Sequence, residues 1–282
     1  MAESLQLLKR RIKTAKNIAQ IGKAMEMISA SKIKRAQKAV ENNKPYAIRI
    51  TDLTKTATEA VDLGSFNHPY LKTGQSNKKI VIMISPDRGL CGSLNTNLFK
   101  KVIEYEDKDL LVITVGKKVE RFANRIKLNI IASFPMGNTV PSLSLVYQLT
   151  QIVNPYILNG EVSDVSILFA EFKSIFQQTP QSYRLLPINR SEIDSEKKDL
   201  PYKAEPSWEK ILSELLPHYF EVRLYNALIN AYTSEQAARM VAMQSAKNNA
   251  LDVADFLTLS YNKFRQERIT NELLDLSNGR FV

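Results

Sequence analysis

The placement of helix-breaking residues divides this chain of 282 residues into three parts. All eleven prolines lie between Pro45 and Pro217, and of the nine glycines only Gly22 precedes residue 64 and only Gly279 follows residue 160. Inside a helix a proline costs about 3 kcal/mol and a glycine about 1 kcal/mol relative to alanine. The sequence therefore predicts a long uninterrupted helix at each end and a separate globular unit in the middle.

The first part carries two sets of residues at the three- and four-residue spacing of coiled coils. The first set is Leu5, Leu8, Ile12 and Ala15, and the second is Ile18, Ile21, Met25 and Ile28. The two sets do not share one register, because the step from Ala15 to Ile18 shifts the pattern by several tens of degrees in a helix that advances about 100° per residue. We therefore expect this helix to face two environments.

The last part has a more regular seam, whose residues are small at first and larger toward the end. Small seam residues allow a second helix to approach closely. The expected positions are Leu224, Ala227, Ala231, Ser234, Ala238, Val241 and Ser245, followed by Ala254, Leu257, Tyr261 and Phe264.

Helices of this length need a partner. Roughly 55 residues at the front and 65 at the back give about 80 and 100 Å at a rise of about 1.5 Å per residue, and propensity alone does not stabilise them. We expect a long antiparallel coiled coil of the two terminal helices with the middle domain inserted. The predicted domain limits are 1–58 and 207–282 for the helices and 77–190 for the inserted domain.

The middle part alternates between strand-like and helix-like segments. This alternation predicts an α/β domain with a parallel, doubly wound, Rossmann-like sheet, followed by an added strand pair and a flexible loop. The expected strands are 79–84, 110–115 and 128–134, the helices 94–105, 117–124 and 142–158, the added pair 165–172 and 176–186, and the loop 189–206.

The loop after the first expected strand, 85–95, is where such a sheet would bind a nucleotide. It has neither the glycine, lysine and serine or threonine spacing of a phosphate-binding loop nor the three spaced glycines of a dinucleotide site. Gly89 and Gly92 are expected to permit a tight turn. We predict no cofactor.

The same loop contains Cys91, the only cysteine, so a disulfide framework and a multi-thiolate metal site are excluded. A thiol near a helix start can be a nucleophile, which leaves a cysteine enzyme and a packed turn residue as alternatives. Neither His68 nor His218 is near it in sequence. Asp87 and Arg88 are either a catalytic pair or a structural ion pair or cap. We expect no enzyme active within this chain alone.

The formal net charge of +10 lies almost entirely in the first helix. Residues 1–58 hold 13 basic and 4 acidic residues, whereas 220–282 hold 7 of each. Three hypotheses fit this pattern: a solvated helix face, a basic arm on nucleic acid, or a rod inside an acidic protein collar. Tyr46 is the first aromatic residue, and the lack of interleaved aromatics argues against single-strand binding.

Neither a membrane-spanning segment nor a signal peptide is expected. The sequence has no run of some 18 apolar residues, and the first 15 residues lack the apolar stretch of a signal peptide. A reducing cytosolic compartment is favoured by the single cysteine.

Four motifs, in the right order along the whole chain, resemble the gamma subunits of F-type ATP synthases. They are IGKAMEMISASK at 21–32, DRGLCG at 87–92, SEQAARMVAM at 234–243, and LSYNKFRQ at 259–266 with Ile269 and Thr270.

The resemblance implies a non-catalytic central shaft. In that family the terminal helices enter a hexamer of three alpha and three beta subunits, and the inserted domain sits with epsilon on the ring of membrane c subunits. Rotation driven by proton or sodium flow gives ATP synthesis. Carried over by motif, the expected contacts between shaft and collar are Lys23, Met25, Lys32, Arg239, Gln266, Thr270 and Glu272. No nucleic acid is expected in this reading; a basic coiled-coil nucleic-acid-binding protein is the alternative.

The sequence departs from the family pattern at several contact positions. Gly22 replaces the usual Thr, Asn230 takes a position that is often acidic, and Asn271 stands where Gln is common. Glu267 and Arg268 replace small residues. These departures put individual contacts in doubt but not the role as a shaft.

The resemblance also implies a location. Met1 stands directly before the first helix with no transit peptide, and the cysteine-bearing insertion of chloroplast relatives is absent. We therefore expect a peripheral protein on the cytoplasmic side of a bacterial membrane.

Overall fold

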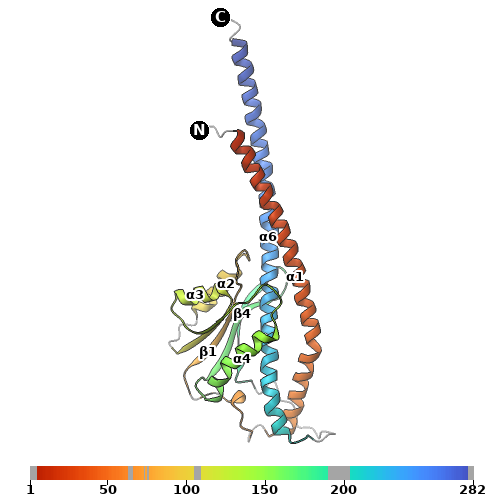
Figure 1. Cartoon of the computed structure of the whole chain (residues 1–282), viewed down its shortest axis with the longest axis vertical. Coiled ribbons are helices and arrows are strands. Elements are labelled where there is room, and N and C mark those ends of the chain that lie inside the picture. Colours follow the sequence, from red (N-terminus) through yellow and green to blue (C-terminus); the bar gives the residue numbers. More distant parts are fainter. Residues whose placement is uncertain are drawn as a thin grey trace. The chain divides into compact units, whose positions relative to one another are not determined.

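The computed structural model describes residues 5–62, 66–72, 74, 76–104, 109–189 and 204–278. The chain forms two compact units: a helical unit of Met1–Ala30 with Arg239–Val282, and an α/β unit of Ser31–Ala238. Two helices contribute to both units, α1 (Leu5–Ala60) and α6 (Trp208–Asn278) (Figure 1). The predicted fold class, α/β with long terminal helices, is confirmed, while the predicted limits of the three domains stay a prediction.

Both long helices contain a proline near the limits of the glycine- and proline-rich middle. Pro45 lies inside α1 and Pro217 inside α6. Burial of neighbouring residues such as Ile50 and Phe220 in the core of the α/β unit offsets the local cost of proline. The middle part is therefore shorter than the range from Pro45 to Pro217: it begins after α1 ends at Ala60 and ends before α6 begins at Trp208.

In the helical unit, α1 and α6 run antiparallel, so that the first turns of α1 lie beside the last part of α6 (Figure 1). Leu8 and Ala15 of the first predicted set are buried, whereas Ile18, Ile21 and Ile28 of the second set are 49%, 61% and 55% exposed. The prediction that α1 faces two environments is confirmed.

The predicted seam of α6 is correct through Ala238 but fails at Ser245, which is exposed. In the helical unit, α6 buries Arg239 and Met243, which were not predicted seam positions, and Ala254, which was, with Lys247 half-buried between Met243 and Ala254. At this shifted seam, α1 approaches α6 closely at Gly22, next to Met243 and Lys247.

The α/β unit contains a five-stranded sheet in the order β3-β2-β1-β4-β5. The strands are β1 (Lys79–Ile84), β2 (Leu110–Val115), β3 (Asn129–Phe134), β4 (Asp164–Phe172) and β5 (Gln178–Leu186). The first four are parallel, with Ile80 opposite Leu111 of β2 and Val165 of β4. Only β5 is antiparallel. The first strand of the predicted added pair is therefore part of the parallel sheet, and only the second is an addition.

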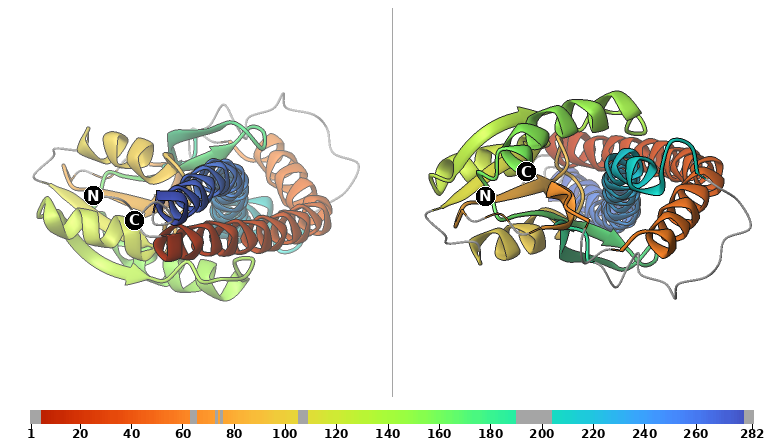
Figure 2. Two further views of the ribbon diagram at one scale, coloured as in Figure 1. Left: turned by 90° about the horizontal axis from the view of Figure 1, so that it is seen from above. Right: turned by 90° about the horizontal axis from the view of Figure 1, so that it is seen from below.

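Helices cover both faces of this sheet, which explains why the strands are apolar without alternation. The helices are α2 (Leu94–Ile103), α3 (Lys117–Arg125) and α4 (Leu143–Leu158). Val81 and Met83 of β1 pack with α2 and α3 on one face. Ile80 and Ile82 pack on the other face with α4 and with the α1 and α6 segments of this unit. Figure 2 shows α2 and α4 on opposite sides of the strands.

The connection from α1 to β1 includes one short 3-10 helix, η1 (Pro69–Leu71), whose Tyr70 is buried and donates a hydrogen bond to Asn154 of α4. Of the predicted loop 189–206, residues 190–203 lie outside the described residues.

Candidate functional site

The carboxyl end of the parallel sheet is the first candidate site, and its backbone amides are already bonded to Asp87. The Asp87 carboxylate accepts hydrogen bonds from the N–H groups of Lys117 at 2.9 Å, Met136 at 3.3 Å and Gly137 at 2.9 Å. Because Lys117 opens α3, the carboxylate occupies the anion-binding position at a helix N-terminus. The capping alternative predicted for Asp87 is confirmed.

Helix α6 fills the space beside this edge. Ala231 and Glu235 of α6, together with the end of β1 and the start of α2, line a cavity of about 10 Å³, room for one water at most. Ala238 packs with Cys91 and Ala170 in a small apolar cluster. Among the described residues, the Asp87 carboxylate and side chains of α6 therefore occupy this edge of the sheet.

The geometry around Cys91 is that of a packed turn residue. The thiol is 2% exposed, and the Asn95 amide donates a hydrogen bond to Sγ at 3.2 Å. His68 Nδ1 accepts the N–H of Tyr70, and His218 Nδ1 lies 3.1 Å from Glu221. Within the part of the chain that the structure describes, no three His, Cys, Asp or Glu side chains group as metal ligands would.

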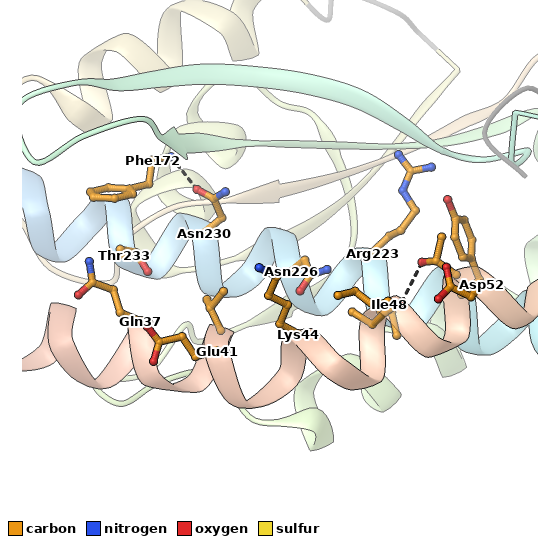
Figure 3. A pocket seen from close by; sticks show the side chains of 15 residues that line it. Gln37, Glu41, Lys44, Ile48, Asp52, Phe172, Arg223, Asn226, Asn230 and Thr233 are labelled. Atoms are coloured by element: carbon orange, nitrogen blue, oxygen red, sulfur yellow. Dashed lines mark hydrogen bonds between the residues drawn. The ribbon is translucent and has the colours of Figure 1, made fainter.

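A groove of about 910 Å³ lies between α1 and α6 in the α/β unit (Figure 3). Two carboxylates, Glu41 and Asp52, and two cations, Lys44 and Arg223, line it. The guanidinium of Arg223 stacks near two tyrosine rings, at 5.4 and 5.9 Å from their centroids. Because its charges balance, the lining selects neither an anion nor a cation.

Asn230, at one end of this groove, is one of the departures from the family pattern. Its side-chain Oδ1 accepts the backbone N–H of Phe172 at 2.6 Å (Figure 3). The amide thus ties α6 to the last residue of β4, a structural role for this departure.

The residues predicted to contact a collar lie on both units. Lys23 is exposed and Met25 half-buried on α1 of the helical unit, and Arg239 of α6 is buried at 8% exposure. Lys32 belongs to the α/β unit, where its ammonium donates a hydrogen bond to Asn138 Oδ1.

The other three predicted residues lie together near the end of α6. Gln266, Thr270 and Glu272 are all exposed. The Thr270 hydroxyl donates to the backbone carbonyl of Gln266 at 3.0 Å, and Glu272 forms an ion pair with Arg268 at 2.8 Å. The Gln266 amide and the Thr270 hydroxyl oxygen therefore face outward, and Arg268 changes the charge pattern beside them.

Around these residues α6 is exposed on every side. Each residue from Lys263 to Leu274 is exposed, including apolar Ile269 at 49% and Leu273 at 61%. A helix end that exposes apolar residues in several directions is unusual for a soluble monomer and marks an interaction surface.

A second group of exposed apolar residues on α6 was not predicted from the sequence. Leu251, Val253, Phe256 and Leu259 are 45%, 51%, 68% and 71% exposed. They lie between the predicted seam positions, and the three-residue spacing of Val253, Phe256 and Leu259 was the signal that could have identified them.

The long helices thus carry outward apolar residues, and the carboxyl edge of the sheet in the α/β unit is occupied by side chains of the chain itself. Among the described residues, no helix combines the length and apolar content that a membrane crossing requires.

Comparisons with known proteins identify the family. The model of the family described as ATP synthase matches residues 4–280. The ATP synthase gamma chains of Dehalococcoides mccartyi strain CBDB1 and Roseiflexus castenholzii are 36% and 37% identical, over 98% of this chain and 98% and 97% of theirs. A chain of the Euglena gracilis mitochondrial ATP synthase, solved with F1 and the c-ring, has the same fold, with a TM-score of 0.69 and 18% identity over 97% of this chain and 92% of that one. The protein belongs to the ATP synthase gamma-chain family.

Proposed function

We propose that this chain is the central rotor shaft of an F-type ATP synthase, turning inside a collar of three alpha and three beta subunits. It catalyses no reaction itself and couples ion flow through the membrane sector to ATP synthesis, or ATP hydrolysis to ion pumping. Family membership over the full length supports this role. It provides no support for the nucleic-acid alternative. The observation that carries it is the exposed end of α6.

The end of α6 needs another protein around it. An isolated helix of the length of Lys263–Leu274 is marginal in water, and here its apolar residues point in several directions. A partner on one side would leave half of this surface in water. A ring of subunits encloses it, and the outward apolar residues of α1 extend the same kind of surface.

An asymmetric shaft can drive conformational change only through contacts that differ among the states of its partner. Exposed Lys23 lies next to Met25 on α1, whereas Gln266 and Thr270 offer hydrogen-bonding groups on α6. As the shaft turns, each beta subunit meets these surfaces in succession. We propose that Lys23, Met25, Lys32, Arg239, Gln266, Thr270 and Glu272 take part in these contacts.

The α/β unit is proposed to bind the epsilon subunit and the c-ring and so to connect the shaft to the membrane sector. Its filled sheet edge supports a structural role there. The protein would then be peripheral to a bacterial cell membrane on the cytoplasmic side.

Reconstitution tests the proposed function. Mixed with alpha and beta subunits of the same organism, the chain is expected to copurify in one complex whose ATPase activity depends on it. A chain that stays apart from alpha and beta, and instead binds RNA or DNA in a salt-sensitive way, would contradict the rotor assignment and support the alternative.

Removing the outward polar groups near the end of α6 should weaken coupling. The double variant Gln266→Ala/Thr270→Ala is expected to lower ATP synthesis by the assembled complex roughly 5- to 30-fold, because one or two lost hydrogen bonds of about 1 kcal/mol each correspond to factors of this size. The matched control is Gln148→Ala/Gln151→Ala, two exposed glutamines of α4, which should leave the rate unchanged. Equal effects of the two double variants would refute the contact assignment.

A further inference from the structure

Glu26 interrupts the otherwise uncharged seam of α1. Between Leu8 and Ser29, a range that is described throughout, the seam positions alternate in steps of four and three residues, and Glu26 alone is ionisable. They are Leu8, Ile12, Ala15, Ala19, Gly22, Glu26 and Ser29. A single charged or polar residue in such a seam typically fixes the register between helices at some cost in stability.

The partner of Glu26 comes from the other helix. Lys247 Nζ lies 2.9 Å from Glu26 Oε2, and the two side chains are only 24% and 23% exposed. By contrast, the pair Arg268–Glu272 within α6 is 67% and 61% exposed. The Glu26–Lys247 pair is therefore less screened by solvent, and its ammonium and carboxylate have fewer competing partners.

Gly22 brings the backbones together one helical turn before Glu26. A Cβ atom at Gly22 would lie 3.3 Å from both Cβ and N of Lys247 and 3.3 Å from the carbonyl oxygen of Met243. The stem of Lys247 thus lies against Gly22 while its head reaches Glu26. Gly22 sets the separation of the helices, and the ion pair sets their axial position.

We propose that Gly22, Glu26 and Lys247 form a register lock that fixes α1 against α6 within the helical unit. The lock holds the outward residues of α1, such as Ile18 and Ile21, in phase with those of α6, such as Leu251. Its three members are positioning residues. Its consequence for coupling rests on the proposed rotor function, whereas its effect on register does not.

The register can be measured in the full-length chain by spin labels. With Cys91 replaced by serine, nitroxides at Ile18→Cys and Leu251→Cys, both exposed positions, report the distance between the helices by electron paramagnetic resonance. In the parent we expect one narrow distribution of distances between the labels. In Lys247→Met, which keeps an apolar side chain of similar length but loses the charge, the distribution should be about twofold broader or split. Glu26→Gln should act similarly.

Three further variants separate charge pairing from packing. The charge exchange Glu26→Lys/Lys247→Glu is expected to restore the narrow population, whereas Gly22→Val should broaden it as Lys247→Met does. Lys16→Met, the same change at an exposed position of α1, should have no effect. The proposal is wrong if Lys247→Met and Glu26→Gln leave the population narrow, or if the exchange fails to restore it.

Coupling gives the second measurement. In the assembled complex, Lys247→Met and Glu26→Gln are expected to lower ion pumping per ATP hydrolysed about twofold, and the double neutral variant by no more than either alone, since both remove one interaction. The charge exchange should recover it. If the variants change the distance between the spin labels but the chain forms no ATPase complex, the register lock is supported and the rotor assignment is overturned. An intact coupling ratio despite a broadened register overturns the lock's role in coupling.

Discussion

Replacing Gly116 by alanine is expected to lower the free energy of unfolding by about 4 kcal/mol, a large part of the roughly 5 to 15 kcal/mol that stabilises a typical domain. Gly116 follows β2 with a φ of 104°, and a Cβ atom there would lie 1.9 Å from the carbonyl oxygen of Ser85. That oxygen belongs to backbone at the end of β1, so it cannot move without displacing the sheet.

The matched control is Gly137→Ala. Gly137 also has a positive φ, 81°, but a Cβ atom there meets nothing within 4 Å. Its replacement should cost about 1 kcal/mol, the conformational part alone. Urea unfolding can be followed by the fluorescence of the single tryptophan, Trp208, which packs against the core of the α/β unit. Equal losses at the two glycines would exclude the contact with Ser85 as the cause.

The Asp87→Ala variant is expected to lose about 2 to 3 kcal/mol of stability. Three backbone N–H groups, two from the loop after β3 and one from the start of α3, would lose their acceptor together, and charge-assisted hydrogen bonds of this kind contribute more than neutral ones. Asp87→Asn keeps one acceptor oxygen and should lose about half as much.

Asp52→Ala serves as the comparison for Asp87. Asp52 is an exposed carboxylate of α1 in the same unit, and its replacement should change the unfolding free energy by less than about 0.5 kcal/mol. The same urea unfolding measurement applies. If the two variants had the same free energy of unfolding, the three hydrogen bonds of Asp87 would stabilise the fold no more than hydrogen bonds to water do.

The two long helices and the sheet could be predicted because their signals are local. A proline or glycine destabilises the helical turn in which it lies. A strand that is buried on both faces, such as Lys79–Ile84, is a run of apolar residues whichever elements cover it. The position of β4 in the parallel sheet was not predictable in this way. It depends on pairing with β1, about 80 residues earlier in the chain.

The seam between the helices was predictable only in part. Small size at Ser245 suggested a seam position, yet Lys247 lies there, because its apolar stem packs against Gly22 and its charge meets Glu26, 221 residues away in sequence. The departure at Gly22 was visible in the sequence, but the residue that fills its space was not. Likewise, exposure of Leu259 depends on which face of α6 is covered by α1.

The hydrogen bonds of Asp87 also bear on how the protein behaves among nucleotides. Many doubly wound domains change conformation when ATP or a dinucleotide binds at the sheet edge, so their shape follows the concentration of that ligand. Here a covalently attached carboxylate accepts hydrogen bonds from these amides. The position that a ligand phosphate takes in such domains is therefore occupied by a side chain of the protein itself.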